Sequence, residues 1–447
     1  MIDRDISEPF RLMPLAYAGA SGRCGGRMTS HSYPPSELGS LWTRLGVSAP
    51  VDAELRHPLC LVASITNLRQ IEEAHGTTCA LAVRHFVSER AHALCEERRG
   101  SATMSGEHIL FVFDALPEPL HNEPLYNSFT ANLLDQVLSG LGERGIPTGP
   151  GIVFPTISVK VVNFGDEPFD IVSAGATRML HGQPGSAWRK QFVEDTEIAE
   201  GIFRAIDEDR LRFHFEPVCH ASQLRSVDYF EALLCENVAG TNTRVRVGSL
   251  VPALERLGLV RRLDHWVLES IIGMLRDDPY ARLGCNISAQ SATLDAWWVS
   301  TVAVLGEQPE VARRLTIEIT ETAPMTELGE VQEFVHVLRF LGCRVALDDV
   351  GGGYCSLTSL LYLNIDIAKI DASFIRAARL ADSGPARLQH IVALARTCAS
   401  VVVAEGIESE VDARIACESG ATCLQGYLYS RDVALSYGRF NSGGTNQ

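Results

Sequence analysis

The sequence contains no two cysteines at the CxxC spacing, although it has 12 cysteines in all. Closely paired cysteines are the usual signature of a zinc–thiolate or redox site, so we expect neither here. Cys285, Cys343 and Cys423 fall inside stretches that read as strands. Cysteine packs in cores as a small apolar side chain, and we therefore expect reduced thiols in a cytoplasmic protein.

The chain also lacks an uninterrupted apolar run of the ~18 residues that a membrane-spanning helix needs. Its first six residues include two aspartates and one arginine, which argues against a signal peptide. Residues 1–50 are rich in glycine, serine and proline, and we expect them to form a mobile tail.

Basic residues are scarce. Lysine and arginine total 39 against 55 aspartates and glutamates, which gives a formal net charge of −16. This balance argues against binding polymeric nucleic acid or an anionic membrane through a general basic field. A small phosphorylated ligand held through a divalent cation remains compatible with it.

The most informative stretch is 343–350, an apolar strand that runs into Asp348 and Asp349 and then into three glycines. Adjacent ionised carboxylates repel each other, so a fold tolerates them best in solvent or on a cation. In a barrel of alternating strands and helices, active sites are built at this end of the strands.

Other strand-like runs also carry a polar group late in the run. Helical patterns such as 330–342 separate most of them, and this alternation from about residue 210 to 430 predicts a parallel sheet. About 250 residues is the usual size of a closed eight-stranded barrel, so we expect an α/β fold with a TIM-like (β/α)8 barrel. The runs are 228–234 with Glu231, 282–288 with Asn286 and Ser288, 314–321 with Glu318 and Glu321, 367–371 with Lys369 and Asp371, 401–408 with Glu405 and Glu408, and 423–429 with Gln425.

The strand-end set offers oxygen ligands and no histidine or cysteine. Hard oxygen donors favour Mg²⁺ or Mn²⁺ over Zn²⁺, and several carboxylates can hold two cations ~3.5–4 Å apart for phosphodiester cleavage. Such cations neutralise the phosphate, lower the pKa of a water and stabilise the leaving oxygen. The donors are Glu231, Asn286, Glu318, Asp348 and Asp349.

Lys369 and Glu405 complete this expected site. Lys369 would orient the water or offset charge in the transition state, and Glu405 would be either a further ligand or a proton acceptor. Taken singly, a glutamate in a strand is usually a solvated edge residue, and paired aspartates often open a turn. The joint pattern over several strands is what favours a site.

Seven short stretches of the chain follow one another in this order: 231–233, 286–288, 318–321, 348–354, 369–371, 404–408 and 425–427. In their residues and in their order they resemble the motifs of the EAL domain, the family of cyclic di-GMP phosphodiesterases. The resemblance covers residues 200–437 and implies hydrolysis of cyclic di-GMP to linear pGpG with two Mg²⁺ or Mn²⁺ ions. It implies metal ligands at Glu231, Asn286, Glu318, Asp348, Asp349 and Glu405; catalytic roles for Lys369, Glu405, Asp349 and Glu321, the last anchoring the loop after the aspartates; and substrate contacts from Gln425, Asp371, Ser288 and Leu233.

The sequence departs from the family pattern near the expected ligand. Cys235 stands where the family has a ligand-binding arginine, and Glu216 stands where it has glutamine. Val350 replaces phenylalanine, and Gly352 replaces threonine. Loss of one charged hydrogen bond costs on the order of 1.5–3 kcal/mol, or roughly one to two orders of magnitude in affinity. We therefore expect retained but weak phosphodiesterase activity.

The first half of the chain predicts a smaller α/β domain. Its pattern indicates a strand at 57–66, helix to about 98, a hairpin over 101–114, a helix at 127–142 and a strand at 152–164.

This domain resembles the GGDEF domain of diguanylate cyclases, but in a degenerate form. Its signature position, 105–109, matches well only at Gly106 and Glu107. Without a carboxylate to hold Mg²⁺ on GTP, cyclase activity is not expected. The family's metal-binding aspartate aligns with Ser64, and its guanine-contacting pair aligns with Glu72 and Glu73.

We expect four segments: a tail at 1–50, the GGDEF-like domain at 51–187, a connecting helix at 188–209 and the EAL domain at 210–440. The first domain would serve dimerisation or GTP sensing, and the resemblance implies a homodimer. Two alternatives to an enzyme stay open: a receptor that senses cyclic di-GMP, or a partner protein, with little turnover, and a scaffold that binds no nucleotide.

Overall fold

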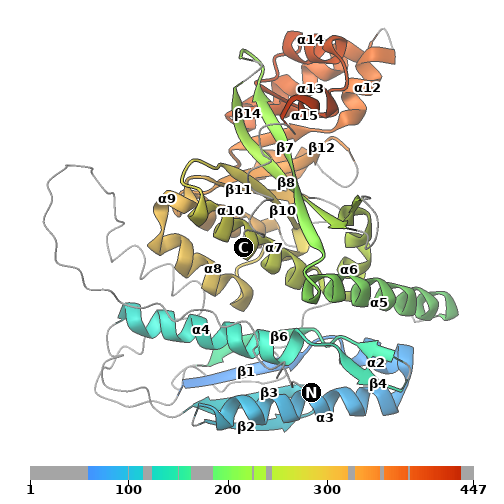
Figure 1. The fold of residues 1–447 in the computed structure, drawn as a ribbon, viewed down its shortest axis with the longest axis vertical. Coiled ribbons are helices and arrows are strands. Elements are labelled where there is room, and N and C mark those ends of the chain that lie inside the picture. The colour runs from blue at the N-terminus through green and yellow to red at the C-terminus, as the bar shows by residue number, and fades with distance from the viewer. Residues whose placement is uncertain are drawn as a thin grey trace, which may run out of the picture. The chain divides into compact units, whose positions relative to one another are not determined.

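The structure is a computed structural model that describes residues 59–98, 100–113, 123–149, 151–162, 185–223, 226–237, 244–320, 328–352, 357–380 and 383–433 (Figure 1). The expected tail, Glu321 and the loop residues Gly353 and Tyr354 lie outside these ranges. None of the helices in these ranges combines the length with the apolar composition that a transmembrane segment requires.

The first sheet is a four-stranded antiparallel sheet with the order β2-β3-β1-β6. The expected hairpin is confirmed, because Ser105 pairs with His108 around Gly106, whose φ is +63°. Positive φ is readily accessible to glycine, which suits it to this turn. The elements are β1 (Leu59–Ile65), α2 (Leu68–His75), α3 (Thr77–Glu96), β2 (Gly100–Ser105), β3 (His108–Phe113), α4 (Glu123–Gly142), β4 (Ile146–Thr148), β5 (Gly151–Val153) and β6 (Ile157–Val162).

Two expected elements in this domain are divided. The helical stretch breaks at Gly76, whose φ of +89° ends α2 before α3 begins. The strand expected at 152–164 is two short strands, β5 and β6, with Pro155 between them. Proline has no N–H for a sheet ladder, which accounts for the interruption.

The second sheet closes into an eight-stranded barrel, as predicted from the alternation of strands and helices. Its order is β8-β10-β11-β12-β13-β14-β15-β7, and β7 pairs back onto β8. The first strand differs from a regular (β/α)8 barrel: β7 is antiparallel to both β8 and β15. The strands are β7 (Leu211–His220), β8 (Val227–Asn237), β10 (Leu283–Ser288), β11 (Leu315–Thr320), β12 (Arg344–Val350), β13 (Ile367–Ile370), β14 (Val401–Ala404) and β15 (Cys423–Gln425), with the short β9 (Arg244–Arg246) on the outer edge of β8.

Helices separate successive parallel strands of the barrel (Figure 1). They are α6 (Val251–Leu257), α7 (Val260–Asp277), α8 (Ala296–Glu307), α9 (Pro309–Ala312), α10 (Leu328–Phe340), α11 (Leu357–Tyr362), α12 (Ala372–Leu380), α13 (Gly384–Cys398), α14 (Glu410–Glu418) and α15 (Tyr427–Val433), preceded by α5 (Ser186–Asp207) and with short 3₁₀ turns at Val247–Leu250 and Ala289–Ser291.

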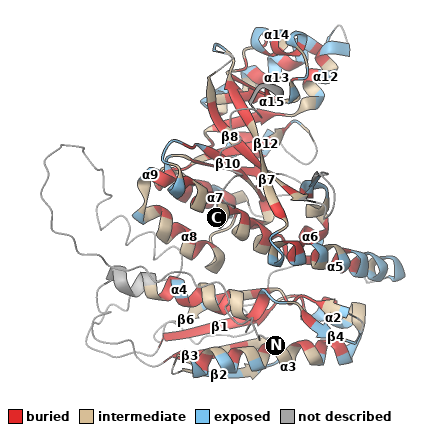
Figure 2. Ribbon diagram, viewed as in Figure 1, coloured by how far each residue is buried: buried red, intermediate tan, exposed pale blue. Residues whose placement is uncertain are grey.

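The barrel interior is built in layers, and its strands are largely buried (Figure 2). Successive residues of a strand face opposite sides, so residues two apart share the interior. One interior cluster is apolar, with Cys423, a predicted core cysteine, among its members. On four parallel strands, and directly after a fifth, the site residue lies two positions after a residue of this cluster: Tyr229 precedes Glu231, Ala346 precedes Asp348, Ile367 precedes Lys369, Val403 precedes Glu405 and Cys423 precedes Gln425.

Gly284 provides the space that one of these polar side chains occupies. A Cβ added there would collide with Oε1 of Glu318 and lie 2.7 Å from Cε2 of Tyr229, and both side chains are buried. The glycine therefore permits Glu318 to sit in the interior.

We predict that Gly284→Ala destabilises the protein by about 1–3 kcal/mol, because overpacking a buried layer forces its neighbours to shift. Gly273→Ala is the matched control, since no atom lies within 4 Å of a Cβ at that helical position. Denaturant unfolding measures both. Equal stability of the two variants would contradict the packing argument.

Candidate active site

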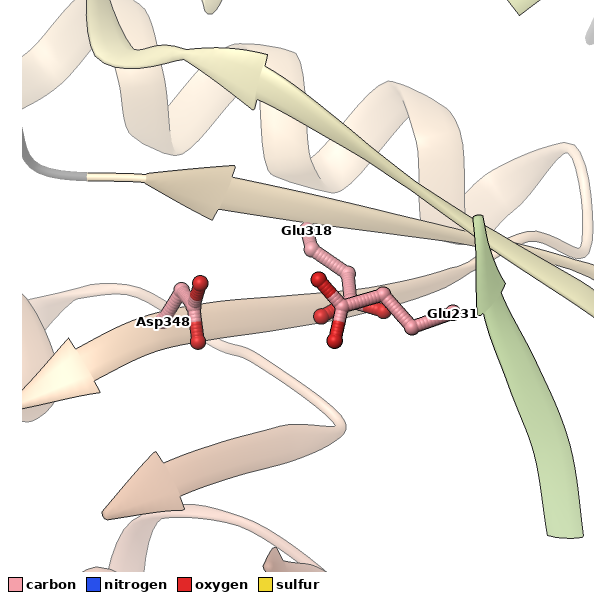
Figure 3. A group of neighbouring side chains, drawn as sticks. All are labelled: Glu231, Glu318 and Asp348. Carbon is pink, nitrogen blue, oxygen red and sulfur yellow. The ribbon is translucent and has the colours of Figure 1, made fainter. Parts of the chain in front are cut away.

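The acidic side chains predicted from the strand ends meet inside the barrel. Glu231 comes from β8, Glu318 from β11 and Asp348 from β12, and Figure 3 shows their carboxylates gathered in one place. One oxygen from each lies within 4.8 Å of the others, and Asp348, Asp349 and Glu405 form a second such group. Both groups contain Asp348, so the two candidate cation positions would be neighbours.

A single ammonium group contacts most of this cluster. The side chain of Lys369, from β13, is only 1% exposed. Its Nζ lies 3.0 Å from Oε2 of Glu231, 2.7 Å from Oε2 of Glu318, 3.0 Å from Oδ1 of Asp348 and 2.9 Å from Oε1 of Glu405. Four carboxylates thus share one positive charge in the barrel interior.

This imbalance of charge shifts the ionisation of the cluster. Burial alone would lower the pKa of Lys369, but the surrounding carboxylates, Asp348 foremost, raise it well above its usual value. Burial raises the pKa of Glu318 to about 8, with Glu231 and Asp348 adding to the effect against the charge of Lys369. Burial likewise raises the pKa of Glu405 well above its usual value. The cluster therefore favours any added positive charge.

Glu231 is the exception among these acids. Burial would raise its pKa, but the charge of Lys369 and hydrogen bonds from Gln425 and Asn286 lower it. Asn286 Nδ2 donates to Oε1 of Glu231 at 2.6 Å, and Gln425 Nε2 donates to Oε2 at 2.5 Å. These contacts fix the Glu231 carboxylate in its ionised form.

Several oxygens of the site have no donor facing them. Within the described residues, Oδ1 of Asn286, Oε1 of Gln425 and Oε1 of Glu318 are buried without a hydrogen-bond partner. Buried acceptors are normally satisfied, so oxygens left open in one cluster need an explanation. A donor set made entirely of oxygens suits a hard divalent cation, and the residues present therefore fit such an ion.

Asp349 is aimed differently from Asp348 because the strand is irregular there. The register of β12 against β13 shifts between Leu347 and Val350, and Asp349 has a φ of +52°. An irregularity of this kind redirects a side chain, and aspartate tolerates positive φ better than most residues. Burial raises the pKa of Asp349 to about 6, and the charges of Asp348 and Asp371 add to the effect.

A cleft of roughly 520 Å³ opens over the cluster. Of the predicted residues, Asp349, Asp371, Glu405 and Gln425 line it directly. Asp371 follows β13, and its Oδ1 accepts the N–H of Ser373 at 3.0 Å. The remaining lining residues are His214, Glu216, Arg246, Ala372, Gly406, Glu408, Gly426, Tyr427 and Ser430.

Two residues predicted to contact the substrate, Leu233 and Ser288, are not among the residues that line the cleft. Leu233, on β8, is half-buried and pairs with His214 across the hairpin. Ser288, at the end of β10, is buried, and its hydroxyl donates to Oε1 of Glu255 at 2.6 Å. Oγ of Ser288 also accepts the N–H of Gln290 at 3.2 Å. In this structure Ser288 is held by protein groups, and its contact with a substrate stays a prediction.

Two of the expected strands end earlier than the sequence indicates. β14 ends at Ala404, so Glu405 and Glu408 lie in the following loop. β15 ends at Gln425, and α15 begins at Tyr427, where a strand is expected to continue. Gly426 makes this turn with a φ of +151°, packed so closely on the backbone of Ile407 that a Cβ would collide with it.

The sequence reasoning did not identify His214 and Arg246 as cleft residues. Arg246 belongs to β9, a strand of only three residues, which is too short to produce a periodic pattern. In the sequence, Arg246 is recognisable only as a positive charge two residues after Arg244. This pattern does not tell whether the side chain lines a cleft or lies on a solvent-exposed strand edge.

The fold and the site define a class of protein: a closed α/β barrel whose interior carries an oxygen-only cluster suited to divalent cations. The EAL domain matches residues 199–432, just over half of the chain. The chain belongs to the EAL domain family.

Individual proteins resemble parts of the chain. It is 30% identical to cyclic di-GMP phosphodiesterase PdeF of Escherichia coli (strain K12) over 252 residues, 55% of this chain and 33% of PdeF. It is 29% identical to cyclic di-GMP phosphodiesterase NbdA of Pseudomonas aeruginosa over 389 residues, 83% of this chain and 48% of NbdA. The chain thus spans between a third and a half of these relatives. An EAL domain protein of Listeria monocytogenes EGD-e aligns in structure with a TM-score of 0.46 at 24% identity, covering 54% of this chain and 97% of that one.

We predict that Lys369→Met destabilises the metal-free protein by about 3–5 kcal/mol, because four buried carboxylates lose their shared partner. Mn²⁺ should then raise the melting temperature of this variant more than that of the unmodified protein. Lys160→Met, which removes an exposed lysine, is the control. A variant as stable as the unmodified protein without metal would contradict the role given to Lys369.

Asp264 holds the end of β10 through hydrogen bonds, and its raised pKa leads to a prediction about stability and pH. Its Oδ2 accepts the N–H of Ser288 at 2.9 Å and the hydroxyl of Ser291 at 2.6 Å. Burial raises the pKa of Asp264 to about 7 against these hydrogen bonds, which lower it. The folded protein therefore keeps a proton that the unfolded chain releases near pH 4.

Asp264→Asn keeps the acceptor oxygen and removes this titration. Because the folded pKa is the higher one, the unmodified protein loses stability relative to Asp264→Asn as the pH rises from about 4 to 7. The difference should reach a few kcal/mol and stay constant above about pH 7. Urea unfolding of both proteins across this range measures it, and a difference independent of pH would refute the assignment.

Proposed function

We propose that this protein hydrolyses cyclic di-GMP to linear pGpG with the help of Mg²⁺ or Mn²⁺. The observation that carries the proposal is the buried cluster of oxygen ligands around Lys369 at the end of an EAL barrel. Two similar proteins are named cyclic di-GMP phosphodiesterases, which supports the choice of substrate.

The residues that would hold two cations follow from the two acidic groups. Glu231, Glu318 and Asp348 would hold one ion, and Asp348, Asp349 and Glu405 the other. The open oxygen of Asn286 would complete the first position. When bound, the cations supply positive charge against the phosphate oxygens and lower the pKa of a nearby water.

The chain's own residues would handle the water and its proton. Lys369, at the centre of the cluster, would orient the water, as proposed from its place in the sequence. Glu405 both contacts Lys369 and lines the cleft, so it is placed between the buried cluster and a substrate. Glu405 would be kept ionised by bound cations, which lower its pKa, so that it would accept the proton as the water oxygen bonds to phosphorus. The bond from phosphorus to the ribose 3′ oxygen then breaks, and that oxygen takes up a proton to give pGpG.

Substrate contacts would come from the cleft wall. Gln425 and Asp371 line the cleft, whereas Leu233 and Ser288 are not among the side chains that do. Cys235 is 4% exposed and brings no positive charge to the ligand. We therefore propose that the activity is weak.

We propose no cyclase activity for the first domain. At the position expected for a metal-binding aspartate, Ser64 lies 2.7 Å from Nδ1 of His108. Glu72 accepts the hydroxyl of Thr77, and Glu73 pairs with Arg69 on the same helix, each at 2.9 Å. Both glutamates are engaged within the protein.

The organisation of the whole chain remains a proposal. We keep as predictions the boundaries 51–187, 188–209 and 210–440 and the degenerate GGDEF assignment. A homodimer, GTP binding and a cytoplasmic location are also kept as predictions. A regulatory role for the first domain would fit the proposed lack of cyclase activity.

Turnover is the direct test. Purified protein is incubated with cyclic di-GMP and Mn²⁺ or Mg²⁺, and pGpG is resolved by chromatography. We expect slow formation of pGpG that disappears in Glu231→Ala, which removes a carboxylate from the cluster. Parallel incubation with GTP should yield no cyclic di-GMP.

Two other outcomes decide between the remaining functions. Binding of cyclic di-GMP without any pGpG would make the protein a receptor and overturn the enzymatic proposal. If the protein does not bind cyclic di-GMP, the hypothesis of a scaffold that binds no nucleotide would remain. A folded Glu231→Ala variant that still turns over would exclude this cluster as the catalytic site.

A further inference from the structure

The cleft over the carboxylate cluster is strongly acidic, yet the proposed ligand is a phosphodiester anion. Five acidic residues line it: Glu216, Asp349, Asp371, Glu405 and Glu408. Among the described residues, Arg246 is the only lysine or arginine that lines the same cleft. An anion bound there would need a positive partner beyond the cations, and Arg246 is the candidate.

The register of three adjacent strands places Arg246 on the ligand side. Arg246 of β9 pairs with Cys235 of β8, and Glu216 of β7 pairs with Glu231 of β8. Glu231 and Cys235 are four residues apart on β8, and paired residues share a face of the sheet. Leu233 and its partner His214 also belong to this face. Arg246 therefore leaves the sheet on the same face as Glu231.

The side chains of Arg246 and Glu216 meet across β8. Nη2 of Arg246 donates to Oε1 of Glu216, and Nε2 of His214 lies 3.9 Å from the same oxygen. The Glu216 side chain is 16% exposed, whereas that of Arg246 is 65% exposed. The pair thus cancels an acidic charge in the cleft wall and keeps a guanidinium accessible from the cleft.

A guanidinium is suited to the further role because it has five N–H donors in a planar fork that matches a phosphate. The contact with one carboxylate oxygen of Glu216 uses only part of this capacity. The same contact restrains the long side chain, which reduces the entropy lost when it grips a ligand.

We propose that Arg246 binds a phosphate of cyclic di-GMP from β9 and replaces in part the charge that Cys235 does not supply, so that binding is retained but weaker. The inference rests on the proposed function and names a substrate-binding residue of that site. Glu216 is a positioning residue: it holds Arg246 over the cleft, and Arg246 in turn shields the ligand from its carboxylate.

The test is calorimetry of the full chain with cyclic di-GMP in Ca²⁺, which takes the same oxygen ligands as Mg²⁺ and Mn²⁺. Chromatography checks that the ligand stays intact. We expect Arg246→Ala to weaken binding by roughly 10- to 100-fold, the effect of losing one charged hydrogen bond. Arg276→Ala is the matched control, since it removes an exposed arginine outside the cleft and should change nothing.

Two double variants distinguish this role from a merely structural one. Glu216→Gln combined with Arg246→Ala should bind more tightly than Arg246→Ala alone, because the uncovered carboxylate is gone. Cys235→Arg should restore more affinity in the Arg246→Ala background than it adds to the unmodified protein, since both guanidinium groups would reach the same face. With Mn²⁺, KM should follow the affinities while kcat changes little.

Affinity unchanged in Arg246→Ala, or a loss that Arg276→Ala shares, would overturn this inference and leave the proposed function standing. Equal gains from Cys235→Arg in both backgrounds would also overturn it. If the unmodified protein binds no cyclic di-GMP at all, the proposed function fails, and the role of Arg246 fails with it.

Discussion

The site depends on one buried contact, that between the ammonium group of Lys369 and the carboxylates around it. Four acids at 2.7–3.0 Å from a single Nζ would repel one another without it. One positive charge does not balance four negative ones. Burial and the uncompensated negative charge of the neighbouring carboxylates therefore raise the pKa values of Glu318 and Glu405. Such a cluster is stable enough to fold and still favours further cations.

The barrel makes this contact possible through its layers. An apolar layer that includes Tyr229 and Ile367 closes the interior on one side, and the polar groups follow two residues later on the same strands. Gly284 leaves room for Glu318, and the irregularity of β12 turns Asp349 toward the cleft. The spacing of the residues along each strand, together with the alternation of side chains in a strand, therefore determines where the acids lie.

Much of this could be predicted from the sequence, because strand–helix alternation and late polar residues are local patterns. The barrel and the meeting of Glu231, Glu318 and Asp348 follow from them. What depends on register or packing could not be predicted: the reversed direction of β7, the protein partners of Ser288 and the contact of Arg246 with Glu216 across β8. The comparison with the family pattern identified the missing arginine at Cys235, but it did not identify Arg246.

The most direct test of the central claim is a crystal structure of the protein with Mn²⁺, using the anomalous signal of manganese to locate the ions. We predict two peaks per chain, one against Glu231, Glu318 and Asp348 and one against Asp348, Asp349 and Glu405. The ions should also bring the open oxygen of Asn286 into contact with metal. No peak among these carboxylates, with Lys369 still in contact with all four acids, would contradict the account.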